Sequence, residues 1–357
     1  MSRCSKGARE VLQFRRVRRH LLMAAGGLWV HGALAAAVPL ALGSARGALV
    51  DVHHHWSNTA LLQWWNRSAA TAGWAADKAL AAMDAAGVRT AMLSVTQPGV
   101  WNSSDGDGSV RIARTCNEAM ARITQDHLGR FGYFAAVALP MVPASVAEIG
   151  YALDALKADG IGLLSSYDGS YLGDPSFTPV FEELNARRAV VYVHPAVPLC
   201  CANLVPEIPA SALEAPSDTS RTIESLLVSG ALARFSAIRF IFAHGGGTLP
   251  FLAERLLDSL VPDPPADKSY LSRYNAKVAL AQLYFDSASV ANAPAWAALT
   301  SFTTPDRILF GSDYPAHEVR AQLGSLRAME QRFGVALADA RSIESGNAQH
   351  LFAARLS

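Results

Sequence analysis

The chain has 357 residues, of which 51% are hydrophobic and 17% are charged, and its formal net charge is +1 at pH 7. This length suits one large α/β domain or two ordinary ones, and the hydrophobic share supports a sizeable core. The balanced charge and the lack of a recognisable nucleic-acid-binding motif argue against a nucleic-acid partner.

The first 45 residues differ in composition from the rest. Arginine pairs at 15–16 and 18–19 precede a long apolar run that ends in small residues. This order is typical of an export signal, and the arginine pairs favour the twin-arginine type. We therefore predict an export signal at 1–45 and a periplasmic or secreted domain at 46–357, with no stable membrane association after cleavage. The alternatives are an uncleaved membrane anchor, or a true start at Met23 that leaves the protein cytoplasmic.

The rest of the chain alternates short β-rich runs with stretches of helical spacing. The β-rich runs lie at 48–53, 89–95, 130–139, 160–166, 189–195, 238–244, 282–288 and 306–313. Near-continuous apolar strands indicate a parallel sheet, and eight strand–helix units are the number that closes a (β/α)8 barrel. We therefore predict an α/β fold, a TIM barrel with a C-terminal helix. An open doubly wound sheet is less favoured because no G-x-G-x-x-G follows the first strand.

Side chains that can bind a metal stand at the ends of several predicted strands. They end strands 1, 5, 6 and 8, and they are His53 and His55, His194, His244 and Asp313. Because alternate residues of a strand share a face, His53 and His55 point together and His54 points away. The carboxyl ends of barrel strands form the catalytic face, so we expect the whole set to meet there.

Three imidazoles and one carboxylate form a donor set that suits Zn²⁺, with water or substrate completing the coordination shell. Mn²⁺ and Fe²⁺ can use the same nitrogen and oxygen donors. The fourth strand ends in "LLSSYDG", without a lysine that could bridge two ions. We therefore predict one divalent metal ion, Zn²⁺ first and Mn²⁺ second, and no organic cofactor.

The cysteines outside the predicted signal are Cys116, Cys200 and Cys201. Three cysteines do not make a disulfide framework, and the spacing of the neighbouring pair does not fit a zinc knuckle. Neighbouring cysteines rarely bridge each other because the small ring that results strains the peptide. We therefore expect Cys200 and Cys201 to be free thiols in a loop.

Together these motifs resemble the amidohydrolase superfamily, and within it the branch of metal-dependent decarboxylases related to aminocarboxymuconate-semialdehyde decarboxylase. The matching stretches are D-x-H-x-H at 51–55, "VHP" with His194, "FAHGGGTLPFLAERL" with His244, "ILFGSDYP" with Asp313 and "GNAQHLF" at 346–352. Other stretches, such as "RFGYFAAVALP" and "DTSRTIESLLVSGALARF", look most like the 6-methylsalicylate decarboxylase group.

The resemblance implies a role for each residue of the set. The metal ligands that it implies are His53, His55, His194 and Asp313, and the implied catalytic residues are His244 and Asp313. Four further residues are candidates for contact with the substrate: Arg221, which could face a carboxylate, Trp56, Asp286 and His317. The resemblance also implies a homodimer and a small aromatic carboxylate as the substrate.

The implied reaction is non-oxidative decarboxylation of a small hydroxy-aromatic acid such as 6-methylsalicylate. The metal would orient the carboxylate and the ortho hydroxyl, Asp313 would protonate the ring carbon, and His244 would stabilise the developing charge. The same residues also suit hydrolysis of a lactone or amide by a metal-bound water. Only the resemblance favours the lyase. A metal-carrying protein without catalysis is a third hypothesis.

Overall fold

The computed structural model describes residues 48–67, 74–198, 200–201, 204–260 and 264–356. The export signal predicted for the first 45 residues lies outside this part of the chain. No helix within the described part is both long and apolar enough to cross a membrane.

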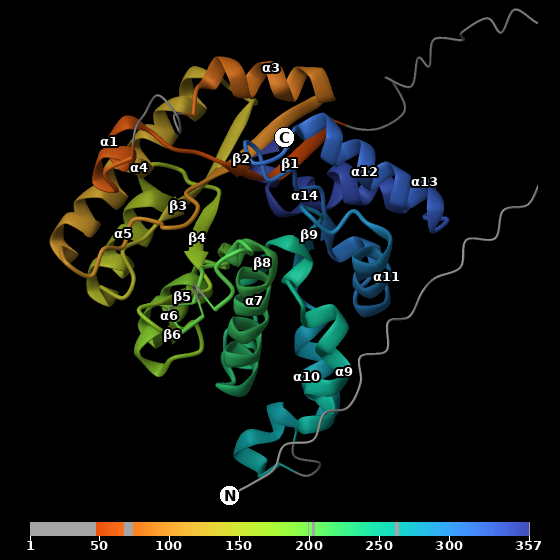
Figure 1. The fold of residues 1–357 in the computed structure, drawn as a ribbon. Coiled ribbons are helices and arrows are strands. Elements are labelled where there is room, and N and C mark those ends of the chain that lie inside the picture. The colour runs from red at the N-terminus through yellow and green to blue at the C-terminus, as the bar shows by residue number, and fades with distance from the viewer. Residues whose placement is uncertain (1–47, 68–73, 199, 202–203, 261–263, 357) are drawn as a thin grey trace, which may run out of the picture. The chain divides into compact units, whose positions relative to one another are not determined.

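Eight parallel strands form the centre of the domain and follow one another in chain order (Figure 1). They are β1 Leu49–His55, β2 Val88–Ser94, β3 Phe131–Ala136, β4 Gly160–Leu164, β7 Val190–His194, β8 Arg239–Phe242, β9 Tyr284–Asp286 and β10 Ile308–Leu309. The chain beyond β10 returns to the first strand, because the Val52 N–H donates to the Phe310 carbonyl and the His55 N–H to the Tyr314 carbonyl. The predicted TIM barrel is therefore confirmed.

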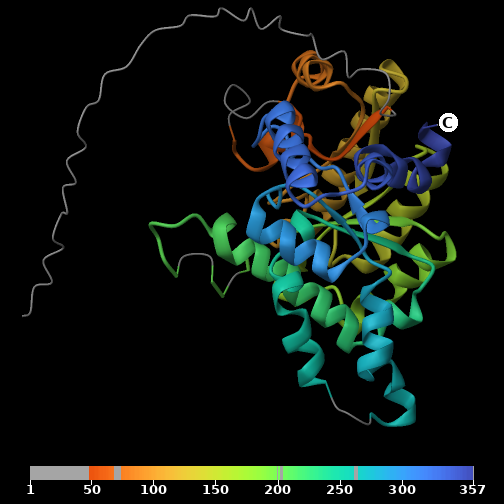
Figure 2. The same cartoon turned by 90° about the vertical axis from the view of Figure 1, so that its right-hand side faces the viewer.

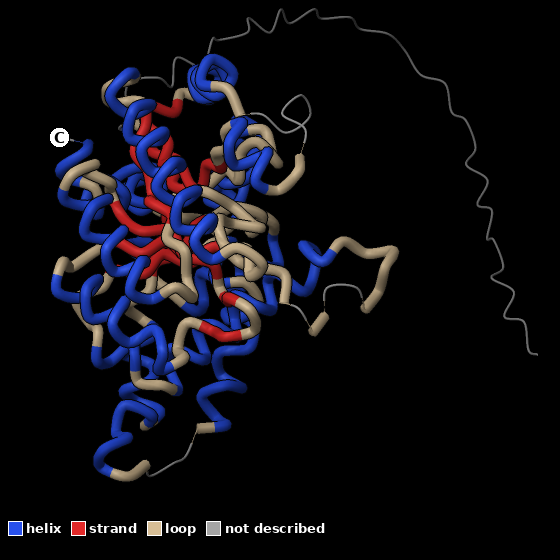
Figure 3. Tube along the Cα trace, turned by 90° about the vertical axis from the view of Figure 1, so that its left-hand side faces the viewer, coloured by secondary structure: helices blue, strands red, loops and turns tan. Residues whose placement is uncertain are grey.

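Helices surround these strands, as the blue tube around the red strands in Figure 3 shows. They are α1 Thr59–Trp64, α3 Ala76–Ala86, α4 Gly106–Asp126, α5 Val142–Asp154, α6 Thr178–Ala186, α7 Ala210–Val228, α8 Ala231–Arg234, α9 Leu249–Ser259, α10 Arg273–Leu280, α11 Ala293–Phe302, α12 Val319–Arg332, α13 Leu337–Arg341, α14 Asn347–Leu351 and α15 Ala353–Leu356. Figure 2 shows the barrel from the side, with the blue C-terminal helices packed beside the strands. A two-stranded hairpin, β5 Ser166–Tyr167 and β6 Ser170–Tyr171, was not predicted.

Helix α4 shows how local sequence forms these elements. Its N-cap is Asp105, whose Oδ1 accepts from the Gly108 N–H at 2.7 Å and so pairs one of the free donors of the first turn. Ile112, Cys116 and Met120 then recur every four residues and are buried. This spacing places one apolar stripe against the strands.

The barrel interior is a packed core and not a channel. Inward-facing side chains from seven of the strands form one cluster with the C-terminal segment: Val50, Val52, Met92, Phe134, Val190, Tyr192, Ile241, Tyr284, Leu309, Leu351 and Phe352. Helix α14 thus helps to fill one end of the barrel, which agrees with the predicted C-terminal helix. The carboxyl ends of the strands, at the opposite end, carry the polar residues described below.

The expectation of free thiols at Cys200 and Cys201 is wrong, because the structure joins them in a disulfide. The chain turns here, and the Cys201 N–H donates to the Pro198 carbonyl at 3.1 Å. The turn lets neighbouring sulfur atoms meet, which an extended chain would prevent. Cys116 is a free, buried thiol.

Gly247 allows helix α7 to approach the segment after β8 closely. Its φ is +68°, and a Cβ there would lie 2.0 Å from the backbone oxygen of Pro216 in α7. We expect Gly247→Ala to lower the free energy of unfolding by about 2–4 kcal/mol, through backbone strain and displacement of the helix. Urea unfolding followed by circular dichroism measures this.

Gly324 is the matched control, because no described atom lies within 4 Å of a Cβ built there. This glycine is in the middle of α12, where alanine is the better helix former, so Gly324→Ala should raise stability by about 0.5–1 kcal/mol. Equal stability of Gly247→Ala and the wild type would contradict the close approach.

Candidate metal centre

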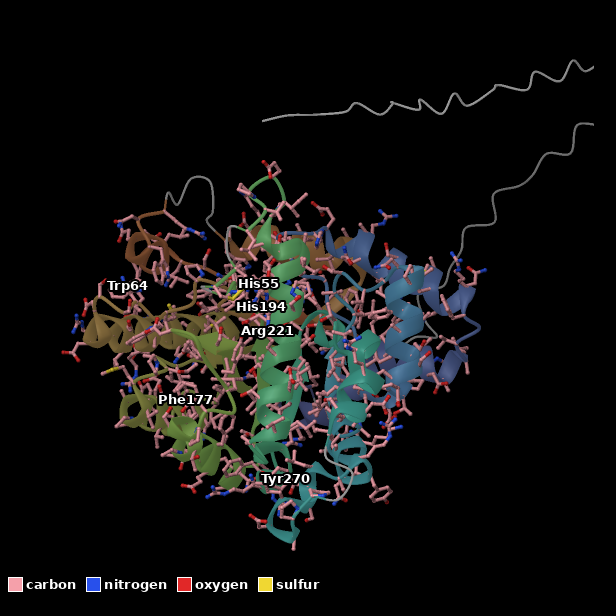
Figure 4. The ribbon with its side chains drawn as sticks, turned by 60° about the horizontal axis from the view of Figure 1, so that its bottom comes forward. His55, Trp64, Phe177, His194, Arg221 and Tyr270 are labelled. Carbon is pink, nitrogen blue, oxygen red and sulfur yellow. A yellow bond between two sulfur atoms is a disulfide. The ribbon has the colours of Figure 1, made fainter. Side chains whose placement is uncertain are left out.

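The predicted set of four histidines and one aspartate meets at the carboxyl ends of the strands. The ring centroid of His53 lies 4.7 Å from that of His55, 5.3 Å from that of His194 and 4.8 Å from that of His244. Oδ1 of Asp313 lies 3.0 Å from Nε2 of His55. Figure 4 shows His55 and His194 close together in the middle of the domain.

Two overlapping groups of donor atoms in the described residues can hold a metal ion. One is His53, His55 and His194, and the other is His53, His244 and Asp313; the donor atoms of each group lie within 4.8 Å of one another. His53 belongs to both groups, so the five side chains surround one position. This arrangement is a divalent-metal site of nitrogen and oxygen donors.

Asp286 lies beneath this position and fixes the orientation of His53. Its Oδ2 is 2.9 Å from Nδ1 of His53 and accepts from the Tyr192 hydroxyl at 3.1 Å. Its Oδ1 accepts from the backbone N–H groups of His244 and Ala288, both at 3.0 Å. Because the proton of His53 is held on Nδ1, the lone pair of Nε2 faces the metal position.

The placement of Asp286 corrects the expectation that it contacts the substrate. Its side chain is fully buried, and four protein donors already use its oxygens. The sequence carries one clue to this role: a histidine that binds a metal through one nitrogen needs a partner for the other. Nothing in the sequence, however, says which carboxylate provides it.

The other two histidines that share a group with His53 are also oriented through Nδ1. Nδ1 of His55 lies 3.3 Å from the Ser94 hydroxyl, and Nδ1 of His194 lies 2.9 Å from the Pro195 carbonyl. In each case Nε2 is left for the metal position. The Ser94 hydroxyl, at the end of β2, was not predicted to take part.

The electrostatics of the cluster favour a cation at its centre. Burial disfavours charge on His53, but Asp286 and Asp313 outweigh it and raise the pKa of His53 to about 10. Burial lowers the pKa of His55 to about 4, with a further contribution from the charge of His53. The pKa values of Asp286 and Asp313 are lowered despite their burial, chiefly by His53. Two buried carboxylates thus hold a proton that a divalent ion can replace.

Burial also lowers the pKa of His194 and His244, and neighbouring histidine charges add to this. Both imidazoles are therefore neutral at pH 7. Neutral nitrogens are the form in which histidine binds metals. The donor set on this face fits the divalent ion that the sequence predicts.

Backbone strain is found at both predicted catalytic residues. The φ of His244 is +54° and that of Asp313 is +60°, in the left-handed region that residues other than glycine seldom adopt. Such outliers cluster at functional sites, where the surrounding structure holds them in place. Here each strained residue follows the end of a strand and turns its side chain toward the metal position.

His54 lies away from the cluster, as strand alternation predicts. Its ring stacks on Tyr314 at a centroid distance of 4.5 Å, and its Nδ1 lies 3.2 Å from Oδ2 of Asp51. Asp51 also accepts from the Ser312 N–H at 2.9 Å and from the Ser312 hydroxyl at 2.6 Å. Asp51 therefore joins the first strand to the segment that carries Asp313, a role that sequence reasoning missed.

A register shift in β1 explains why Asp51 faces away from the metal position. Asp51 pairs with Ala91 and His54 with Leu93, so three steps on β1 correspond to two on β2. A bulge of this kind reverses the facing of the residues before it relative to those after it. Simple alternation would have placed Asp51 on the same face as His53 and His55.

The remaining candidates occupy different places. Trp56 packs in the layer between strands and helices and lines a cavity with Trp74, so the expectation that it contacts substrate at the metal is wrong. It follows the inward-facing His55 and therefore points outward. Nε2 of His317 lies 3.7 Å from Oδ2 of Asp313, with nearly half of its side chain exposed. Arg221, on α7, hydrogen-bonds the hydroxyl of Tyr171.

We expect the two neighbouring histidines of β1 to respond differently to the same substitution. His53→Gln removes a donor that both groups share, so bound metal should fall to a small fraction of one ion per chain. His54→Gln leaves the donor set intact and should keep the stoichiometry of the wild type. Metal analysis after dialysis measures both, and equal metal content in the two variants would refute this assignment.

Comparison with known proteins places this geometry in a family. The sequence profile of the amidohydrolase family matches residues 50–353. The 6-methylsalicylic acid decarboxylase acuB of Aspergillus aculeatus is 35% identical over 315 residues, which cover 85% of this chain and 95% of the relative. A 6-methylsalicylic acid decarboxylase of Penicillium expansum is 33% identical over 314 residues, covering 85% and 96%.

Solved structures share the fold. The 2,6-dihydroxybenzoate decarboxylase from Rhizobium superposes with a TM-score of 0.75 at 23% identity, covering 86% of this chain and 99% of that one. A dihydroxybenzoic acid decarboxylase from Polaromonas, solved with manganese and an inhibitor, gives 0.73 at 20% identity, covering 86% and 97%. The profile match and the two close relatives together show that this chain belongs to the amidohydrolase family, in its branch of decarboxylases related to aminocarboxymuconate-semialdehyde decarboxylase.

Proposed function

We propose that this protein is a metal-dependent decarboxylase of 6-methylsalicylate or a closely similar hydroxy-aromatic acid. The observation that carries the proposal is the likeness to 6-methylsalicylic acid decarboxylases over 95–96% of their length. The assembled cluster supports it, because the five residues that the reaction needs surround one position. Hydrolysis of a lactone or amide, which the residues alone also allow, has no comparable support from the relatives.

We propose one ion per chain, Zn²⁺ or Mn²⁺. Three imidazoles and a carboxylate suit Zn²⁺, and Mn²⁺ accepts the same donors. Manganese is present in the Polaromonas structure, which shares only 20% of its sequence with this chain. His53, His55, His194 and Asp313 would hold the ion, and when bound it would act as a Lewis acid toward the substrate oxygens.

Asp313 is the residue that we assign to proton transfer. The histidines beside it hold its pKa well below the usual range, chiefly through His53, so it is an anion before substrate binds. The proton that it delivers must therefore be collected first, and the ortho hydroxyl of the substrate is the acidic proton of such a molecule. Transfer of this proton to the ring carbon breaks aromaticity, and loss of CO₂ leaves the electron pair in the ring and restores it.

His244 is placed to stabilise the charge that develops during this transfer. Its backbone N–H is fixed by Asp286, and its Nδ1 lies 3.4 Å from the Ala288 carbonyl, which orients the ring. A neutral, buried imidazole needs no reorganisation when the transition state forms. His317, near Asp313 at the more exposed side, and Arg221 are proposed as contacts for the substrate carboxylate or ring substituents. In support, Nη1 of Arg221 is buried with no partner among the described residues.

The direct experiment is incubation of the metal-loaded protein with 6-methylsalicylate, followed by detection of CO₂ and m-cresol. We expect both products in equal amounts. We expect Asp313→Asn to reduce turnover by about 10²–10⁴-fold, the usual contribution of general acid–base catalysis. His54→Gln, outside the cluster, is the matched control and should retain most of the activity. Absence of CO₂ from every hydroxybenzoate tried, with turnover of a lactone, would overturn the lyase in favour of the hydrolase.

A further inference from the structure

A second cavity lies on the outer side of β1, away from the metal centre. Its volume is about 400 Å³, and α1, α3 and α4 enclose it together with the residues just after His55. The walls are largely apolar, formed by Trp56, Leu62, Trp74 and Ile123. This size falls in the range of about 300–1,000 Å³ that is usual for small-molecule sites.

Two hydrogen-bond donors in this wall have no protein partner. The indole nitrogens of Trp56 and Trp74 are both buried, and none of the described residues accepts from either. Trp56 is only 2% exposed. Buried indole N–H groups usually find a partner, because leaving one unpaired costs the full desolvation of that group. Two such donors on one cavity therefore indicate a ligand that accepts hydrogen bonds.

Helix α3 begins at the same cavity. Its N-cap, Ala75, has no side-chain oxygen to accept from the first turn, and both Ala75 and Ala76 line the cavity. The free N–H groups and the positive end of the helix dipole favour an anion at such an end. The helix has 11 residues, so its dipole is well developed, and Asp77 in its first turn is exposed to solvent.

The rim of the cavity carries one cation and one anion, a turn apart on α4. Arg122 and Asp126 both line the cavity and are exposed. Within the described residues neither forms an ion pair closer than 4 Å. Arg122 can therefore meet a carboxylate, and Asp126 can accept a hydrogen bond from a ring hydroxyl.

We propose that this cavity is a second binding site for a small, single-ring aromatic carboxylate. The ring lies against Trp56 and Trp74, and the carboxylate accepts from the indole N–H groups and the first turn of α3, with Arg122 at the rim. The site is separate from the metal centre, since the chain alternates between His55, which faces the metal position, and Trp56, which faces the cavity. It does not depend on the proposed decarboxylation.

The probe is benzoate, which has the ring and carboxylate but lacks the ortho hydroxyl that favours the metal centre. Equilibrium dialysis and tryptophan fluorescence of the metal-loaded full chain measure its binding. We expect a saturable site at which Trp74→Phe and Trp56→Phe, which keep a ring but remove the N–H, each raise the Kd roughly tenfold or more. Arg122→Gln, on the exposed rim, should weaken binding with no effect on folding.

Trp296→Phe is the matched control. The indole nitrogen of Trp296 is also buried without a described partner, but this residue does not line the cavity. Its substitution should leave the Kd for benzoate unchanged. Benzyl alcohol, which has the ring without the charge, should bind at least about tenfold more weakly than benzoate if the helix end and Arg122 act on a carboxylate.

Three results would overturn the proposal. The first is no saturable binding of benzoate, which would mean that water alone satisfies the indoles. The second is a single benzoate per chain that is lost in Asp313→Asn and unaffected by Trp74→Phe, which would place it at the metal centre. The third is equal affinity for benzoate and benzyl alcohol, which would exclude a carboxylate site. None of these results bears on CO₂ release, so failure here is distinguishable from failure of the proposed function.

Discussion

The hydrogen bonds to the buried carboxylate of Asp286 are the interaction on which the metal site depends. They join His53 on β1, Tyr192 on β7, the backbone after β8 and the backbone after β9. One side chain thus ties together four parts of the barrel that are far apart in the sequence. It sets the tautomer of His53 and, through the backbone of His244, the position of the strained residue beside it. A buried carboxylate with this many donors is costly to disturb.

The ring of strands closes at the point where the site needs it most. Asp51 of β1 accepts from Ser312, and the Asp313 N–H donates to the His53 carbonyl at 2.9 Å. These contacts bring the last metal-binding residue of the chain against the first. The barrel core below them is packed with apolar side chains, so the polar residues have one open side. The bulge in β1 and the left-handed backbone at Asp313 are the local distortions that this arrangement requires.

The sequence was sufficient for the architecture and for the identity of the cluster, because both depend on regular rules. Eight apolar runs predicted eight parallel strands, and strand-end positions predicted that His53, His194, His244 and Asp313 meet. Alternation sorted His54 from its neighbours. These inferences need only the period of a strand and the rule that barrel sites lie at strand ends.

What the sequence could not provide depends on register and on contacts between distant residues. The bulge that turns Asp51 outward is a pairing irregularity without a residue signature. The role of Asp286 follows from which strand neighbours which ring nitrogen, and only the fold decides that. The expectation for Trp56 failed because nearness to His55 in sequence was taken as nearness in the pocket, although the next residue of a strand faces the other way. The Cys200–Cys201 disulfide depends on a local turn that composition does not predict.

The most direct test of the account is the metal affinity of Asp286→Asn, measured by competition with a chelator of known affinity. The substitution keeps the size of the side chain but removes the charge that holds the His53 proton on Nδ1. We expect metal affinity to fall about 10–100-fold, as for other residues that orient metal ligands, while circular dichroism shows an intact fold. Unchanged metal affinity in a folded Asp286→Asn protein would contradict the claim that this buried carboxylate organises the metal centre.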